Sequence, residues 1–282
     1  MAVEFAGTLF AHKNKKGASL LVSVSHAHRY SIVTSGELMG MGLHDNIHSV
    51  ELVTTSEADG NLVLLNGNNF SGSFVQLTAA ASFGDAMWNP DGHARSVILV
   101  AGKRQGKSEV RLSFRDQFLH QWEKFLDDKL AGGRASRHGK PTLTWEMFPA
   151  SMPPLDPEHI YLKIHQRLHI SMPWPYVDYA ASMTYHIHLF VNGQHRLRAS
   201  GARWSYWVES GIKAGHISGD LEPKVKGGLP TLVHQVNANL SKLDSTASIS
   251  GVYYLPGKQL TPLGTGSLTG HTSDDVTIVV EF

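Results

Sequence analysis

The sequence predicts a mostly β protein, in which an N-terminal β-sandwich is followed by an α+β domain with a mostly antiparallel sheet. The sandwich is indicated by an internal repeat and by short alternating segments that are separated by Gly, Asn and Asp turns. The change from a β-sandwich to an α+β domain is indicated by aromatic residues at helical spacing, which are followed by further alternating segments. The predicted boundaries are a first domain over residues 1–102, a linker over 103–112 and a second domain over 113–282.

Composition restricts the classes of protein to which this chain can belong. Its 282 residues suffice for two domains, and 41% hydrophobic against 17% charged residues indicates a globular core. A net charge of +1 provides no general field that would attract nucleic acid. The chain has no cysteine, which excludes disulfides and thiolate nucleophiles.

The sequence also bears on location. No apolar run reaches the length of about 18 residues that a membrane-spanning helix needs. The N-terminus lacks a basic segment followed by an apolar run, so no signal peptide is visible. We therefore expect a soluble chain with no transmembrane segment, which is either cytoplasmic or secreted through a non-classical or removed signal.

The internal repeat relates two halves of the N-terminal region. Gly17 follows Leu9 by eight residues, and Gly72 follows Leu64 by the same interval. A glycine after a tight turn supplies backbone angles that other residues resist. The halves close on the related segments 49–53 and 96–100, and the serine that begins each can bond back to a nearby turn. The repeat therefore predicts a duplicated β unit.

These residues resemble the motif of the βγ-crystallin family. Family members carry an aromatic-x-Gly hairpin, which here is Phe70-Ser71-Gly72. They also carry an Asn/Asp-rich loop that ends in serine and follows a tryptophan, here Trp88; the loops are residues 44–49 and 91–96. The resemblance covers about residues 3–102 and implies a double Greek-key sandwich.

The resemblance also implies calcium as a cofactor. The candidate ligands in the two loops are Asp45, Asn46, His48, Asp91 and His93. In calcium-binding members the fifth loop position supplies a Ser or Thr hydroxyl, whereas here it is His48 or Arg95. Calcium prefers oxygen ligands, and a fixed guanidinium charge repels it. We therefore expect either weak calcium binding or a purely structural sandwich.

The segment between the two predicted domains has the composition of a phosphate-binding loop. Such a loop must open a helix, but Val110, Leu112 and Phe114 alternate after residues 101–108, which favours extended chain. We interpret the segment as a basic linker that contains glycine.

The second predicted domain combines helices with strands. A helix is predicted from Ser113 to about Leu130, with a core-facing stripe of Phe114, Phe118, Trp122, Phe125 and Leu126. Residues 132–141 are predicted to be a mobile loop, and residues 230–243 a second helix. The predicted strands are residues 159–170, 179–191, 195–209, 249–255 and 275–282.

The first two of these strands carry a histidine-rich face. If they pair with their apolar sides together, the numbers of paired residues sum to an odd value. One face then carries His165, His169, His186 and His188. Neighbouring imidazoles bind transition metals, or they form a pH-sensitive patch that contacts anions. A solvated sheet face that tolerates histidine is the simpler alternative.

Catalytic motifs are absent from the sequence. It contains no His-Glu-x-x-His helix, no Gly-x-Ser-x-Gly elbow and no nicotinamide-binding fingerprint. We expect a non-enzymatic binding or structural protein, in which the crystallin-like module is joined to a domain that binds a protein, a glycan, or a lipid or other apolar ligand. One alternative is a secreted toxin or membrane-active effector, because βγ-crystallin-like modules occur beside such domains. The other is a metal-dependent enzyme that uses the histidine face.

Overall fold

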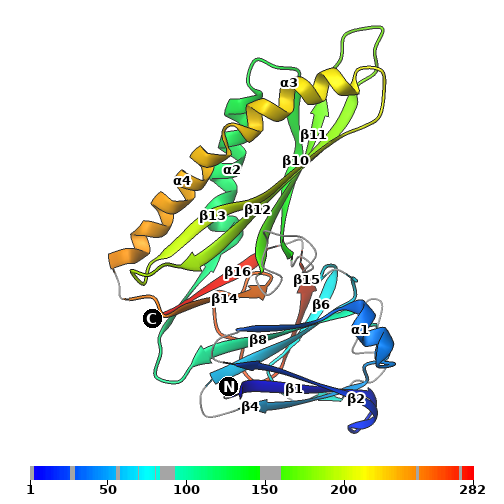
Figure 1. The fold of residues 1–282 in the computed structure, drawn as a ribbon, viewed down its shortest axis with the longest axis vertical. Helices are drawn as coiled ribbons and strands as arrows, with labels where there is room; N and C mark the ends of the chain where they lie inside the picture. Colours follow the sequence, from blue (N-terminus) through cyan, green and yellow to red (C-terminus); the bar gives the residue numbers. More distant parts are fainter. Residues whose placement is uncertain are drawn as a thin grey trace. The chain divides into compact units, whose positions relative to one another are not determined.

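The protein is described here by a computed structural model, which covers residues 3–25, 29–54, 58–68, 70–79, 81–82, 93–146, 160–245, 248–272 and 275–282. The fold is mostly β with antiparallel sheets, as the sequence predicted (Figure 1). The chain divides into two compact units. Unit 1 comprises Met1–Ser113, Thr144–Ile160 and Ser250–Phe282, and unit 2 comprises Phe114–Leu143 and Tyr161–Ile249. No helix in the described ranges has the length and apolar character that crossing a membrane requires.

The repeat forms two sheets in unit 1. The first half supplies β1 (Val3–His12), β2 (Lys16–Ser25), β3 (Tyr30–Val33), α1 (Ser35–Gly40) and β4 (Ser49–Thr54). The second half supplies β5 (Ala58–Leu65), β6 (Ser73–Leu77), β7 (Ala81–Ser82) and β8 (Ser96–Arg104). The strand orders are β2-β1-β4-β7 and β15-β6-β5-β8-β3. In each half the fourth strand pairs with the first, while the third strand pairs in the sheet of the other half.

The two halves close with the same hydrogen bonds. Ser49 Oγ donates to the carbonyl of His12 (2.6 Å) and accepts from the amide of Lys15 (3.0 Å). Ser96 Oγ donates to the carbonyl of Gly67 (2.6 Å) and accepts from the amide of Phe70 (3.3 Å). The glycines are equivalent as well, since Gly17 has φ 82° and Gly72 has φ 85°, a region that favours glycine. The repeat in the sequence is therefore a repeat in the structure.

The C-terminal segment belongs to unit 1, which differs from the predicted boundaries. The strands β9 (Glu109–Ser113), β14 (Gly251–Pro256) and β16 (Val276–Glu281) form a sheet in the order β14-β16-β9, and β15 (Ser267–His271) pairs with β6. Every residue of β16 is buried, and the strand pairs with β14 along one edge and with β9 along the other. The segment expected to be a linker at 103–112 supplies one of these partners, because β9 begins within it at Glu109.

Unit 2 is a four-stranded sheet with helices on one face (Figure 1). The strands are β10 (Ala135–Glu146), whose last residues lie in unit 1, β11 (Tyr161–Ile170), β12 (Tyr179–Val191) and β13 (Leu197–Val208). The helices are α2 (Phe114–Leu130), α3 (Ala214–Lys226) and α4 (Leu229–Leu240), and a 3₁₀ turn, η1 (Ser241–Ser245), follows. The predicted aromatic stripe of α2 is buried, and its Trp122 ring stacks on Tyr185 of β12 with centroids 6.4 Å apart.

Two elements of unit 2 differ from the prediction. Most of the expected mobile loop at 132–141 is the edge strand β10, in which Arg137 pairs with Glu123 and Asp127 of α2. Its first half contains polar and basic residues with no apolar alternation, so sequence periodicity did not detect this strand. Helix α3 was not predicted, since Gly215, Gly219 and Pro223 give it weak intrinsic helix propensity.

Candidate functional site

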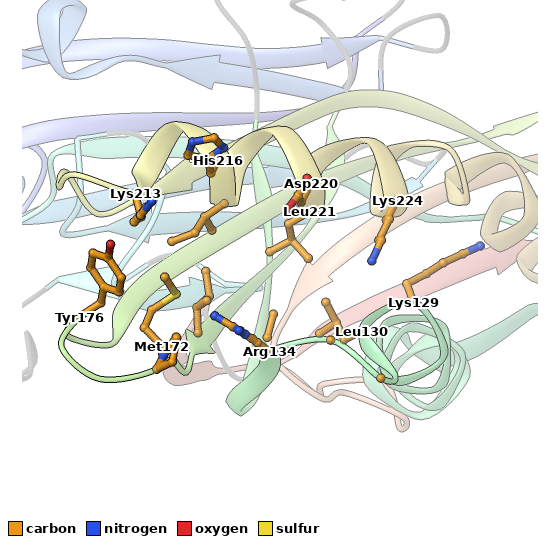
Figure 2. A pocket seen from close by; sticks show the side chains of 16 residues that line it. Lys129, Leu130, Arg134, Met172, Tyr176, Lys213, His216, Asp220, Leu221 and Lys224 are labelled. Carbon is orange, nitrogen blue, oxygen red and sulfur yellow. The ribbon is translucent and has the colours of Figure 1, made fainter.

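A cavity of about 630 Å³ opens within unit 2. It lies among α3, the loop after β11 and the turn after α2 (Figure 2). Its volume falls in the range of small-molecule sites, which is roughly 300–1,000 Å³. Its lining consists of Lys129, Leu130, Gly132, Gly133, Arg134, Ala135, Ile170, Met172, Pro173, Tyr176, Lys213, His216, Ile217, Asp220, Leu221 and Lys224. We call it the basic cavity.

Apolar side chains from three elements form the floor of the basic cavity. On α3, Ile217 and Leu221 are four residues apart and therefore share one face of the helix. Leu130 ends α2, and Ile170 ends β11. Leu130, Ile170 and Leu221 are all buried, so the cavity is anchored in the packed part of the unit. A ligand whose apolar part packs on this floor would remove its own apolar surface from water.

Cations surround this apolar floor. Figure 2 shows Lys213 and Tyr176 at one end of the cavity, Lys129 and Lys224 at the other, and Arg134 between them on the side opposite α3. Asp220 is the only carboxylate in the lining. Within the described part of the chain, none of these four cations forms an ion pair. Lys213 does lie near an aromatic group, with Nζ 5.2 Å from the centre of the Tyr176 ring.

This arrangement is suited to binding an anionic amphiphile. An apolar floor accommodates a hydrocarbon segment, and lysine or arginine forms charge-assisted hydrogen bonds with a carboxylate or phosphate. The cavity could not be predicted from the sequence for two reasons. Its cations lie far apart in the sequence, between Lys129 and Lys224, and α3, which brings them together, has weak helix propensity.

The histidine face forms as predicted, but its members lie apart from one another. Leu162 pairs with Ile187, so the predicted odd sum of residue numbers is confirmed. Thr184 lies opposite His165, Lys163 opposite His186 and Ala180 opposite His169. No histidine of these two strands therefore lies directly across from another in this register.

Each of these histidines also has other contacts. His165 Nδ1 lies 2.9 Å from Thr184 Oγ1, and His169 Nε2 lies 3.0 Å from Asp178 Oδ2. The ring of His188 stacks on that of Phe190 and packs at a tilt against that of Tyr161, and His186 is buried. Among all described residues, no three His, Cys, Asp or Glu side chains are grouped so that they could hold a metal ion.

The pKa values near this face shift for different reasons. Burial lowers the pKa of His165 below its usual 6.5, and the charges of Lys163 and Arg167 lower it further. The amide of Met172 donates to the Asp178 carboxylate and, together with His169, lowers the pKa of that carboxylate. At neutral pH, His165 is consequently uncharged and Asp178 is ionised.

The two candidate calcium loops are joined by an ion pair. Arg95 Nε donates to Asp45 Oδ1 at 3.0 Å, and the Asp45 amide donates to the carbonyl of Ala94. His48 Nε2 lies 3.2 Å from Asn46 Oδ1, and His93 Nδ1 lies 3.1 Å from the Asp45 carbonyl. A guanidinium that already neutralises Asp45 does not fit a calcium site. Asp91 and Trp88 lie outside the described residues.

Unit 1 contains a second set of charges, and these are buried. The Glu281 carboxylate accepts from the Arg104 amide (2.9 Å) and from Ser250 Oγ (3.0 Å). The guanidinium groups of Arg29 and Arg104 lie 3.6 and 3.5 Å from Glu281 Oε1. Burial alone would raise the pKa of Glu281, but these donors and cations outweigh it and the pKa lies below its usual 4.5.

Comparisons of the chain with models of known families, with curated proteins and with solved structures find no match. Its function must therefore be inferred from the geometry of the sites themselves.

Proposed function

We propose that this chain is a non-enzymatic binding protein whose unit 2 binds an anionic amphiphile in the basic cavity. The ligand class is a molecule with an apolar chain and a carboxylate or phosphate head. The proposal depends on one observation, namely an apolar floor surrounded by four cations that have no ion-pair partner among the described residues. Burial of the ligand's apolar chain contributes roughly 25 cal/mol per Å² of apolar surface. The cations select the ligand's anionic head group.

Unit 1 is the structural part of this proposal. We propose that it is a βγ-crystallin-like double Greek-key module. The equivalent serine bonds and the exchange of the third strands between sheets support this. The Arg95–Asp45 ion pair links the two loops, and calcium binds there weakly at most.

The ligand class is tested by calorimetric titration with dodecyl phosphate, with the uncharged dodecyl maltoside as the matched amphiphile. We expect saturable binding of the phosphate and much weaker binding of the maltoside. Replacing two cations, in Lys213→Gln/Lys224→Gln, is expected to weaken phosphate binding about tenfold or more, which is 1.4 kcal/mol.

The control variant is Lys140→Gln, which removes an exposed lysine of unit 2 that does not line the cavity. It should bind dodecyl phosphate like the unaltered protein. Equal affinity for the two amphiphiles, or an unchanged affinity in the double variant, would refute the proposed ligand class.

A membrane-active role is the second candidate function. It is favoured by the exposed apolar side chains of Trp174, Val177 and Ile212, which lie close to the basic cavity.

A further inference from the structure

Two neighbouring loops of unit 2 display apolar side chains to solvent. The loop between β11 and β12 contains Trp174 and Val177, which are 93% and 75% exposed, and the loop between β13 and α3 contains Ile212, which is 90% exposed. Of the large hydrophobic residues in the described part of the chain, these three are the most exposed. We call them the apolar tip. Single exposed apolar residues are common, but a group of them marks an interaction surface.

Hydrogen bonds tie the loop between β13 and α3 to the first residues of β12, directly after the other loop of the tip. The Lys213 amide donates to the Tyr179 hydroxyl (3.2 Å), and Glu209 Oε2 accepts from the Ala180 amide (3.1 Å). The loop between β11 and β12 is braced from within, because Asp178 accepts from the Met172 amide (2.8 Å). The exposed side chains of the apolar tip are therefore carried by loops that hydrogen bonds hold in place.

The basic cavity adjoins the apolar tip. Pro173 and Tyr176, which line the cavity, flank Trp174 in the sequence, and Lys213 follows Ile212 directly. Tyr176 is itself 41% exposed. The apolar tip and the adjoining basic cavity together combine an indole, a phenol and aliphatic side chains with cations that have no ion-pair partner among the described residues. Trp and Tyr favour the interface between lipid and water, and lysine and arginine favour anionic head groups.

We propose that the apolar tip docks unit 2 onto an anionic lipid bilayer, with Trp174, Val177 and Ile212 inserted at the interface. The basic cavity then faces the head groups, so the bilayer is the source of its amphiphilic ligand; in that respect alone this inference rests on the proposed function. A specific protein interface buries about 800 Å² on each partner. One Trp and two aliphatic side chains supply roughly 500 Å², so the tip is small for a protein partner and adequate for shallow insertion.

Co-sedimentation with vesicles tests the docking. The probes are vesicles of phosphatidylcholine alone and of phosphatidylcholine mixed with phosphatidylglycerol. We expect the protein to bind the anionic vesicles about tenfold more tightly than the neutral ones. The tip variant, Trp174→Ser/Ile212→Ser, is expected to lose about tenfold in affinity for the anionic vesicles.

The matched control is Trp207→Ser, since Trp207 is 56% exposed on β13 and does not line the basic cavity. It should bind vesicles like the unaltered protein, and all variants should unfold at the same temperature. The docking proposal is wrong if the unaltered protein does not bind anionic vesicles or if the tip variant binds them normally. It is also wrong if the control variant loses as much affinity as the tip variant.

The same variants separate the two proposals. The tip variant is expected to keep its affinity for dodecyl phosphate, because the replaced side chains do not line the cavity. Loss of vesicle binding by the tip variant together with absent dodecyl phosphate binding in the unaltered protein would contradict the ligand proposal and leave the docking intact. Normal dodecyl phosphate binding without any vesicle binding would overturn the docking alone.

Discussion

The two units place their charges differently. In unit 1, Glu281 is fully buried and faces Arg29 and Arg104, and Asp45 is neutralised by Arg95. In unit 2, the cations around the basic cavity have no carboxylate partner within the described residues, and the neighbouring apolar side chains are exposed. Charges with partners in the same unit stabilise the fold, whereas cations without such partners remain available to a ligand. The predictions below test this contrast.

The largest expected effect concerns the buried charges of unit 1. Replacing Glu281 by Gln leaves Arg29 without its buried anion and leaves Arg104 only the buried carboxylate of Glu4, so the free energy of unfolding should fall by about 3–5 kcal/mol. Denaturant titration measures this. The control is Glu51→Gln, which removes an exposed pair with Lys15 and should change stability by about 1 kcal/mol or less. Similar effects of the two variants would mean that the Glu281 cluster is not a structural centre.

Because Ser49 and Ser96 make equivalent hydrogen bonds in the two halves of unit 1, replacing either serine should lower the free energy of unfolding by a similar amount. Ser49→Ala and Ser96→Ala each remove a buried hydroxyl that bonds two backbone groups, so each should lower stability by about 1–3 kcal/mol. Urea unfolding of both variants provides the comparison. A substantial loss in one variant and none in the other would contradict the equivalence of the halves.

Calcium binding by the two loops of unit 1 tests whether a charge that already has a partner is available to a ligand, and the expected effect is smaller. Millimolar calcium should hardly change the unfolding temperature, because Arg95 already neutralises Asp45. In Arg95→Ser the carboxylate is released and the fifth loop position regains a hydroxyl, so calcium should raise the unfolding temperature. A marked calcium effect on the unaltered protein, measured by thermal unfolding, would show that the ion pair does not take the place of the metal.

The smallest expected effect is a difference in pH response. The pKa of His165 is lowered, so the unfolded chain binds this proton more readily and the stability of unit 2 should begin to fall as the pH drops below 6.5. The pKa of Glu281 is also lowered, so its contribution is present above 4.5 and is lost as the pH falls through the lower folded value. Protection from hydrogen exchange, relative to the intrinsic exchange rate at each pH, should therefore be lost in β11 at a higher pH than in β16. The reverse order would contradict these assignments.

The sequence predicted those features that neighbouring residues determine. The repeat of Gly17 and Gly72, the buried stripe of α2 and the odd-sum register of β11 and β12 all follow from local periodicity, and the structure contains them. The membership of β16 in unit 1 depends on pairing with β9, more than 160 residues earlier in the chain. Periodicity carries no information on such pairings.

The candidate site could not be predicted for a related reason. The sequence drew attention to histidines and Asp/Asn loops, because these residue types carry recognisable chemistry. The basic cavity depends on where α3 places ordinary lysines relative to Arg134 and the apolar floor. Trp174 and Ile212 have unremarkable sequence contexts, and only their exposure distinguishes them.

Hydrogen exchange with and without saturating dodecyl phosphate tests the central claim most directly, because it locates the ligand within the chain. We expect protection of the amides around Arg134, Met172 and residues 213–224, all of which border the basic cavity, and none in β1, β5 or β16. Protection confined to unit 1, or spread evenly over both units, would contradict the claim that the basic cavity is the binding site.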